Sequence, residues 1–301
     1  MVKLKSFGIT LGLAGSLILA GCGNEEGNQD AAAENVSLGE QLDYTITGIE
    51  PGAGITGLSH KALEEYENLE GWELLESSTA GMIGSLEEAI NNEEPIIVTG
   101  WTPHWKFSAY DLKFLEDPKG ILGGSENINT IARKGLEEDM PGAYQILDRF
   151  YWETADMEEV MLNAQKSSYE EAAMNWIEDN SDKVNEWTDG VEKVDGEEIE
   201  LVSTQWDTEL ASGYVMKAVL EQLGYVVTLT PVDPAIVFQA IATGEADASL
   251  APWLPTTHAS FYEQHKEDIV DLGENLEGTQ NGFVVPAYMD IDSIEDLQPK
   301  E

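Results

Sequence analysis

Hydrophobic positions over residues 45–101 alternate between two patterns. Short continuous apolar runs, which are typical of buried parallel strands, alternate with stretches in which apolar residues recur at i, i+3 and i+4, as on a helix face. The runs predict strands that begin at Thr45 and cover 71–76 and 95–101, and the spaced residues predict helices over 58–69 and 80–92. This order predicts a β-α-β-α-β unit, in which parallel strands are joined by helical crossovers.

The same order of elements recurs later in the chain. Strands are expected from Ile199 and over 224–230 and 247–253, and helices over 214–220 and 235–243. The repetition predicts a second β-α-β-α-β unit of the same kind.

The segments outside these two units predict how the units are joined. Residues 127–187 are expected to be helical, because they carry amphipathic patterns, and the run 282–286 is expected to cross back as a strand. The large side chains that we expect in the helical core are Met157, Met161, Trp176 and Trp187.

A chain that leaves one α/β unit, builds a second and returns to the first is typical of two-lobed binding proteins. We therefore expect an α/β fold in which each lobe is a mostly parallel sheet flanked by helices. The first lobe is expected over 43–122 plus 280–301, and the second over 126–278.

The N-terminus has the features of a targeting signal over residues 1–22. Lys3 and Lys5 precede an apolar stretch too short to span a bilayer comfortably, and the stretch ends at Cys22, the only cysteine. The ending resembles the lipobox of bacterial lipoproteins, in which this cysteine is acylated; the alternative is an ordinary secretory signal with an incidental cysteine. A lone cysteine supplies neither an internal disulfide nor a metal site.

Residues 23–42 are polar and acidic and are expected to form a flexible tether.

The formal net charge of −43 makes nucleic acid a very poor partner for this chain. The acidic residues are spread along the sequence, which indicates a highly charged, solvated surface. Such a surface suits saline surroundings, because salt screens the repulsion between its charges.

Tryptophans occupy the positions where a ligand would bind. In open sheets of this type, ligands lie beyond the carboxyl ends of the strands, and Trp101, Trp206 and Trp253 each follow or end a predicted strand. A quaternary ammonium has no N–H to donate, but ring faces attract it. We therefore expect the three indoles to form an aromatic cage; the alternative is that one or more of them only packs between the lobes.

A ligand that also carries a carboxylate would need hydrogen-bond donors. Gly54 and Ile55 open a predicted helix, whose free amides can bind an anion, although glycines here could instead only shape a turn. His258 follows Trp253 closely and is a candidate donor from the other lobe. His104 is a weaker candidate, and Trp105 is expected to pack behind the site.

Four motifs resemble those of one family: Gly48-Ile-Glu-Pro-Gly-Ala-Gly-Ile55, Ile97-Val-Thr-Gly-Trp-Thr-Pro-His-Trp105, Trp206-Asp207, and Ala246-Asp-Ala-Ser-Leu-Ala-Pro-Trp-Leu-Pro-Thr-Thr-His258. They are similar to those of the glycine-betaine-binding lipoproteins of OpuA-type osmoprotectant ABC importers. The resemblance runs in order through nearly the whole mature chain. Pro252 and Ala53 depart slightly from the family pattern, and neither change removes a ligand group.

The resemblance implies a type II periplasmic-binding-protein fold with a permuted lobe order. It implies a cage of Trp101, Trp206 and Trp253 around the trimethylammonium group of glycine betaine. It also implies carboxylate contacts from the amides of Gly54 and Ile55 and from His258. The implied setting is a monomer, anchored through lipid on Cys22 to the outer face of the cell membrane, that serves an ABC permease and needs no cofactor or metal.

Other functions have less support in the sequence. The chain contains neither Gly-x-Ser-x-Gly nor His-Glu-x-x-His, and pairs of carboxylates mean little among 58 acidic residues, so we expect no catalytic residues and no enzyme. A receptor for choline, carnitine or a polyamine is the main alternative. A polyamine would be expected to recruit carboxylates beside the rings, and Asp207 and Glu209 leave that alternative open.

Overall fold

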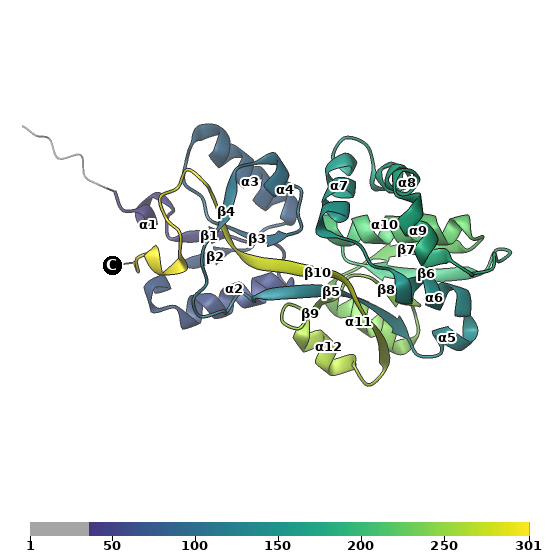
Figure 1. Cartoon of the computed structure of the whole chain (residues 1–301). Coiled ribbons are helices and arrows are strands. Elements are labelled where there is room, and N and C mark those ends of the chain that lie inside the picture. The colour runs from purple at the N-terminus through teal and green to yellow at the C-terminus, as the bar shows by residue number, and fades with distance from the viewer. Residues whose placement is uncertain (1–35, 301) are drawn as a thin grey trace, which may run out of the picture. The chain divides into compact units, whose positions relative to one another are not determined.

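The protein is described here by a computed structural model, which covers residues 36–300 within one compact unit, Val36–Glu301. Its strands form a single mixed sheet in the order β2-β1-β3-β10-β5-β8-β6-β7, with β4 paired to β10 and β9 paired to β5 (Figure 1). The fold is the expected two-lobed α/β architecture, in which two groups of parallel strands with flanking helices are joined by antiparallel strands.

The first predicted β-α-β-α-β unit is confirmed. Strand β1 pairs in parallel with both β2 and β3. Helices α2 and α3 lie on opposite sides of these strands (Figure 1). The elements are β1 (Thr45–Thr47), α2 (Gly54–Glu65), η1 (Glu67–Leu69), β2 (Glu73–Leu75), α3 (Thr79–Asn92), β3 (Val98–Thr102), α4 (Lys106–Ala109) and β4 (Leu112–Phe114).

The second unit is confirmed as well. Strand β6 pairs in parallel with β7 and β8, and α10 and α11 cover opposite sides of these strands (Figure 1). Its third predicted strand is broken into two short pieces, β8 and β9. The elements are β6 (Glu198–Ser203), α10 (Asp207–Gln222), β7 (Val226–Pro231), α11 (Pro234–Thr243), β8 (Ala248–Ser249), β9 (Trp253–Leu254) and α12 (Ala259–His265).

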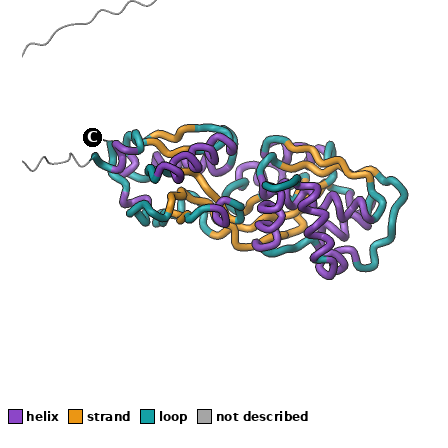
Figure 2. The backbone as a smooth tube through the Cα atoms, turned by 90° about the horizontal axis from the view of Figure 1, so that it is seen from above, coloured by secondary structure: helices purple, strands orange, loops and turns teal. Residues whose placement is uncertain are grey.

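Two long antiparallel strands, β5 (Ser125–Arg133) and β10 (Ile269–Pro286), join the two halves of the sheet. The early part of β10 pairs with β5, and its last residues pair with β3 and β4. Figure 2 shows these orange strands running between the two halves. The prediction of helix from residue 127 is therefore wrong over β5. Asn129 and Thr130 interrupt its apolar pattern, but both are buried between neighbouring strands, where Asn129 donates to Asp271 and Thr130 accepts from Asn275.

Helices fill the rest of the segment before the second unit, as expected. They are α5 (Leu136–Asp139), α6 (Pro141–Arg149), α7 (Thr154–Ala164), α8 (Tyr169–Asp179) and α9 (Ser181–Thr188). The predicted core side chains are all buried, and the Trp176 ring lies 5.6 Å from Trp152 edge-on and 6.0 Å from Trp187 in a stacked arrangement. Aromatic packing of this kind holds the helical layer together.

The described chain begins with a short helix, α1 (Leu38–Gln41). Ser37 and Glu40 form a reciprocal capping box at its start, and Leu42 is buried in the first lobe. For these last residues of the predicted tether the expectation of flexibility is wrong, because a cap and a core contact fix them. The predicted signal 1–22, Cys22 and the tether up to residue 35 lie outside the described residues.

At the other end, 3-10 helix η2 (Ile294–Asp296) packs against the first lobe through Ile294. None of the helices within residues 36–300 combines the length and the apolar character that a bilayer span requires. The lobe boundaries given above stay predictions.

We expect Trp176→Ala to lower the free energy of unfolding by about 3–5 kcal/mol, because it removes a fully buried indole from this aromatic cluster. Met174→Ala is the matched control, since Met174 lies on the same helix α8 with 52% of its surface exposed. Urea unfolding of the chain without its predicted signal, called the soluble body below, measures the free energy of unfolding of both variants. A loss for Trp176→Ala no larger than that of the control would contradict the core assignment.

Candidate functional site

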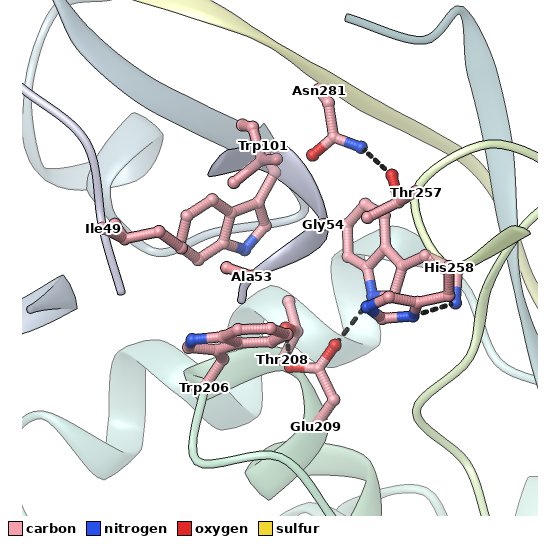
Figure 3. A pocket seen from close by; sticks show the side chains of 12 residues that line it. Ile49, Ala53, Gly54, Trp101, Trp206, Thr208, Glu209, Thr257, His258 and Asn281 are labelled. Carbon is pink, nitrogen blue, oxygen red and sulfur yellow. Dashed lines mark hydrogen bonds between the residues drawn. The ribbon is translucent and has the colours of Figure 1, made fainter. Parts of the chain in front are cut away.

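Three tryptophans from different elements line one cavity (Figure 3). Trp101 lies in β3, Trp253 begins β9, and Trp206 is the N-cap residue of α10. Trp101 and Trp253 are 5% and 3% exposed, whereas Trp206 is half-buried. The empty space at this site, counted together with its opening to solvent, is about 300 Å³. All three indoles that the sequence placed at the carboxyl ends of strands thus lie at one cavity, as expected.

The cavity takes its walls from both lobes and from the crossing strand β10. Most lining atoms are apolar, and a few polar groups converge on the same space, as is usual for small-molecule sites. Besides the three tryptophans, the lining residues are Ile49, Ala53, Gly54, Ile55, Thr208, Glu209, Thr257, His258 and Asn281.

The Gly-rich loop brings the start of helix α2 to the cavity. Ala53 is the N-cap residue and provides no side-chain acceptor, so the first amides of α2, at Gly54 and Ile55, have no intrahelical partner. Gly54 also lies against the opposite lobe: a Cβ there would come within 2.5 Å of the Thr257 carbonyl oxygen. Glycine is therefore required at residue 54 for the lobes to approach this closely.

His258 faces the cavity with one defined donor. Its Nδ1 accepts the backbone N–H of Trp253 at 3.0 Å, so the proton of the neutral ring is on Nε2. Burial lowers the pKa of His258 to about 4, which keeps the ring neutral near pH 7. Within residues 36–300, Nε2 is buried without a hydrogen-bond partner, so it is available to an acceptor in the cavity.

Glu209 supplies a carboxylate to the same cavity. It is 2% exposed, and its Oε1 accepts the indole N–H of Trp253 at 2.7 Å while its Oε2 accepts the hydroxyl of Thr208. Burial raises the pKa of Glu209 to about 7, and these hydrogen bonds oppose that rise. Figure 3 shows the carboxylate between Trp206 and the indole nitrogen that donates to it.

Two polar contacts beside the cavity connect the lobes. Trp206 donates its indole N–H to Glu50 at 3.4 Å, and Trp105 donates its own to Asp207 at 3.0 Å. Asp207 also accepts the hydroxyl of Tyr169. Trp105 was expected only to pack behind the site, and the structure adds this hydrogen bond to the other lobe. Neither Trp105 nor Asp207 is among the lining residues.

Behind Trp101 lies a buried lysine that sequence reasoning missed. The Nζ of Lys106 is 4.4 Å from the centroid of the Trp101 ring, and burial lowers the pKa of Lys106 to about 7. His104 accepts the backbone N–H of Lys106 at 3.1 Å, and burial lowers its pKa well below the ordinary value. Neither residue lines the cavity. The only signal for Lys106 was its place directly after the Trp-Thr-Pro-His-Trp motif.

Glu126 at the start of β5 is a second buried group that the sequence did not reveal. It accepts the backbone N–H groups of Thr256 and Thr257 at 2.6 and 2.7 Å, and the amide of Asn281 at 2.8 Å. These bonds fix the loop that carries His258 onto the two crossing strands. The error over β5 hid this role, because Glu126 was not expected beside the cleft.

Residues 36–300 contain no group of three or more His, Cys, Asp or Glu side chains that could hold a metal ion. The arrangement has two kinds of chemistry instead. The indoles and the Glu209 carboxylate suit a cation, and the N–H donors of His258 and of the start of α2 suit an anion.

A profile of the family described as the substrate binding domain of ABC-type glycine betaine transport systems matches residues 28–179 and 197–301. The chain belongs to this family. It is a substrate-binding protein of a transport system, and the substrate-binding proteins of ABC importers face the extracellular side.

One relative matches nearly the whole chain, and two solved structures match part of it. The glycine betaine/carnitine transport binding protein of Listeria monocytogenes is 49% identical over 283 residues, which are 93% of each chain. Lactococcal OpuAC, solved closed with glycine betaine, is 54% identical over 48% of this chain and 58% of that one, with a TM-score of 0.48. An ABC-transporter choline binding protein solved with choline is 26% identical over 62% of this chain and 61% of that one, with a TM-score of 0.47.

We expect the neutral, buried His258 to make stability depend on pH. Its pKa is lowered in the folded state, so between about pH 6.5 and pH 4 the unfolded chain binds a proton that the folded protein does not. The stability of the native protein relative to His258→Asn should therefore fall as the pH falls through this window. Urea unfolding of both proteins at pH 7.5 and 4.5 measures the effect, and a constant difference between them would contradict it.

Proposed function

We propose that this family member is a lipid-anchored extracellular receptor that captures glycine betaine, and related betaines, between its lobes. It then delivers the solute to an ABC importer for osmoprotection. The observation that carries the proposal is one cavity that is lined both by three indoles and by N–H donors without a partner among the described residues. The names of the relatives support the same ligand class.

The cation end of betaine suits the three indoles. A trimethylammonium group cannot donate a hydrogen bond, and each ring face that meets it contributes about 0.5–2 kcal/mol. We assign Trp101, Trp206 and Trp253 to this cage. Because Trp206 and Trp253 come from one lobe and Trp101 from the other, the cage is complete only when the lobes meet.

The carboxylate end suits the donors on the other wall. We assign it to the amides of Gly54 and Ile55 and to Nε2 of His258. The first two gain from the positive end of helix α2, and the third is a neutral donor with no other partner among the described residues. Donors from both lobes then hold one anion.

Capture in this mechanism involves no chemical change, and we propose no enzymatic activity. The ligand contacts both lobes, so it binds the closed state more tightly than the open one and shifts the population towards closure. Contacts between the lobes, such as Trp105 with Asp207 and Gly54 with Thr257, add to the stability of the closed state. The closed receptor, acting as a monomer, docks on the permease.

Anchoring is proposed from the sequence alone. The signal ending at Cys22 would place lipid at the start of the mature chain, and the tether would hold the receptor at the outer face of the membrane. The acidic surface suits this exposure in saline surroundings.

Carnitine is a second candidate ligand, since the name of the relative from Listeria monocytogenes includes it. It carries both a trimethylammonium group and a carboxylate, so it would use the same two walls. Choline would leave the anion wall empty, and a polyamine would depend on Glu209 and the rings.

Trp253→Ala should weaken the binding of glycine betaine by about 1–3 kcal/mol, or roughly fivefold to 150-fold, because a ring face and its packing are lost. Titration calorimetry of the soluble body measures the affinity. Trp72→Phe is the control, because Trp72 packs in the separate core cluster of the first lobe. Unchanged affinity in Trp253→Ala would refute the cage.

His258→Ala should weaken glycine betaine by about tenfold or more and choline much less, because only betaine has a carboxylate to lose its donor. Titration of the tryptophan fluorescence with glycine betaine and with choline measures both affinities. Equal losses of affinity for the two ligands would show that His258 stabilises the cavity but donates no hydrogen bond to the carboxylate.

A further inference from the structure

Glu209 is the one carboxylate among the described residues that line the cavity. Trp253 donates a hydrogen bond to one of its oxygens and Thr208 donates to the other. None of the ion pairs within residues 36–300 includes Glu209. A buried carboxylate without a cation is costly to keep. Its place in a cavity lined by three indoles points to a cation that arrives with the ligand.

The hydrogen bond to Trp253 connects this charge to the cage. An ionised carboxylate that accepts an indole N–H polarises the donor, and hydrogen-bonded groups in a low-dielectric site polarise one another. Electron density moves towards the ring, whose negative face attracts the cation. Glu209 therefore acts on the ligand twice, directly through its charge and indirectly through the ring of Trp253.

We propose that Glu209 is the counter-charge of the aromatic cage and sets the preference between zwitterionic and purely cationic ligands. The inference rests on the proposed function of the cavity. A betaine carries its own carboxylate, which Glu209 repels while it attracts the ammonium group, so the two effects partly cancel. Choline and tetramethylammonium carry only the positive charge, so they gain the full attraction.

Several titratable groups surround this carboxylate. Asp207 lies on the same helix with Tyr169 donating to it, His258 faces the cavity from its loop, and Glu50 is reached through Trp206. Lys106 and His104 lie in the other lobe, with His104 Nε2 at 3.6 Å from Asp207. Tyr169 and His258 are held in their neutral forms, since burial raises the pKa of the first and lowers that of the second.

Burial raises the pKa of Glu209 to about 7, so its charge changes within the physiological range. A bound cation favours the ionised form, and binding near pH 7 should therefore release a proton. The affinity for a pure cation should rise with pH from about 6 to 8.5. The affinity for glycine betaine should rise less, because its net interaction with Glu209 is smaller.

The test is titration calorimetry of the soluble body with glycine betaine, choline and tetramethylammonium at pH 6 and 8.5, at one ionic strength. Glu209→Gln keeps an acceptor for Trp253 but removes the charge. We expect it to weaken the two cations by about tenfold or more at pH 8.5 and betaine by clearly less. The pH dependence of cation binding should also become smaller, and what remains should come from Lys106 beside the Trp101 ring, because burial lowers its pKa to about 7 as well. Glu209→Asp, which keeps the charge, should retain the pH dependence.

Glu221→Gln is the matched control, because Glu221 lies on the same helix, is exposed and pairs with Lys217. Its affinities and pH profile should equal those of the native protein. Equal losses for betaine and the cations in Glu209→Gln, or an unchanged pH profile, would overturn the role of Glu209 alone. Native protein that binds none of the three ligands would overturn the proposed function and this inference together.

Discussion

Trp253 makes two hydrogen bonds that organise the whole cleft. Its backbone N–H donates to Nδ1 of His258 and thereby fixes the proton on the side of the ring that faces the cavity. Its indole N–H donates to Glu209, which fixes the ring plane and holds a carboxylate beside it. One residue thus determines the orientation of a ring face, an N–H donor and a buried acid. Groups held in this way need little reordering when a ligand enters, which favours tight binding.

The crossing strands β5 and β10 hold the loop that carries His258 in place. Glu126 and Asn281, one on each strand, hold the loop that carries Thr257 and His258. The same loop touches Gly54 of the opposite lobe, where only a glycine leaves enough room. A change in the angle between the lobes therefore moves the anion donors relative to one another. This connects the closing motion of a two-lobed fold to the completeness of its site.

Much of this architecture could be predicted from the sequence, because its strongest signals are local. The two β-α-β-α-β units follow from apolar spacing, and the expectation that ligands bind beyond the carboxyl ends of the strands brought the three indoles and the Gly-rich loop to one cavity. The failures have a common cause. Strand β5 is buried with Asn and Thr among its apolar residues, so its pattern did not identify a strand. Lys106 and Glu126 owe their burial to partners distant in the chain, and composition carries no signal of that kind.

The charges at the cavity differ in kind from those of the surface. The chain carries −43 in total, mostly on exposed side chains that salt screens effectively. Around the cage, Lys106 lies beside the Trp101 ring and Glu209 hydrogen-bonds to Trp253, and burial brings the pKa of each to about 7. The low dielectric there strengthens every interaction that remains. A small difference in ligand charge therefore changes the binding free energy most inside the cleft, where salt screens least.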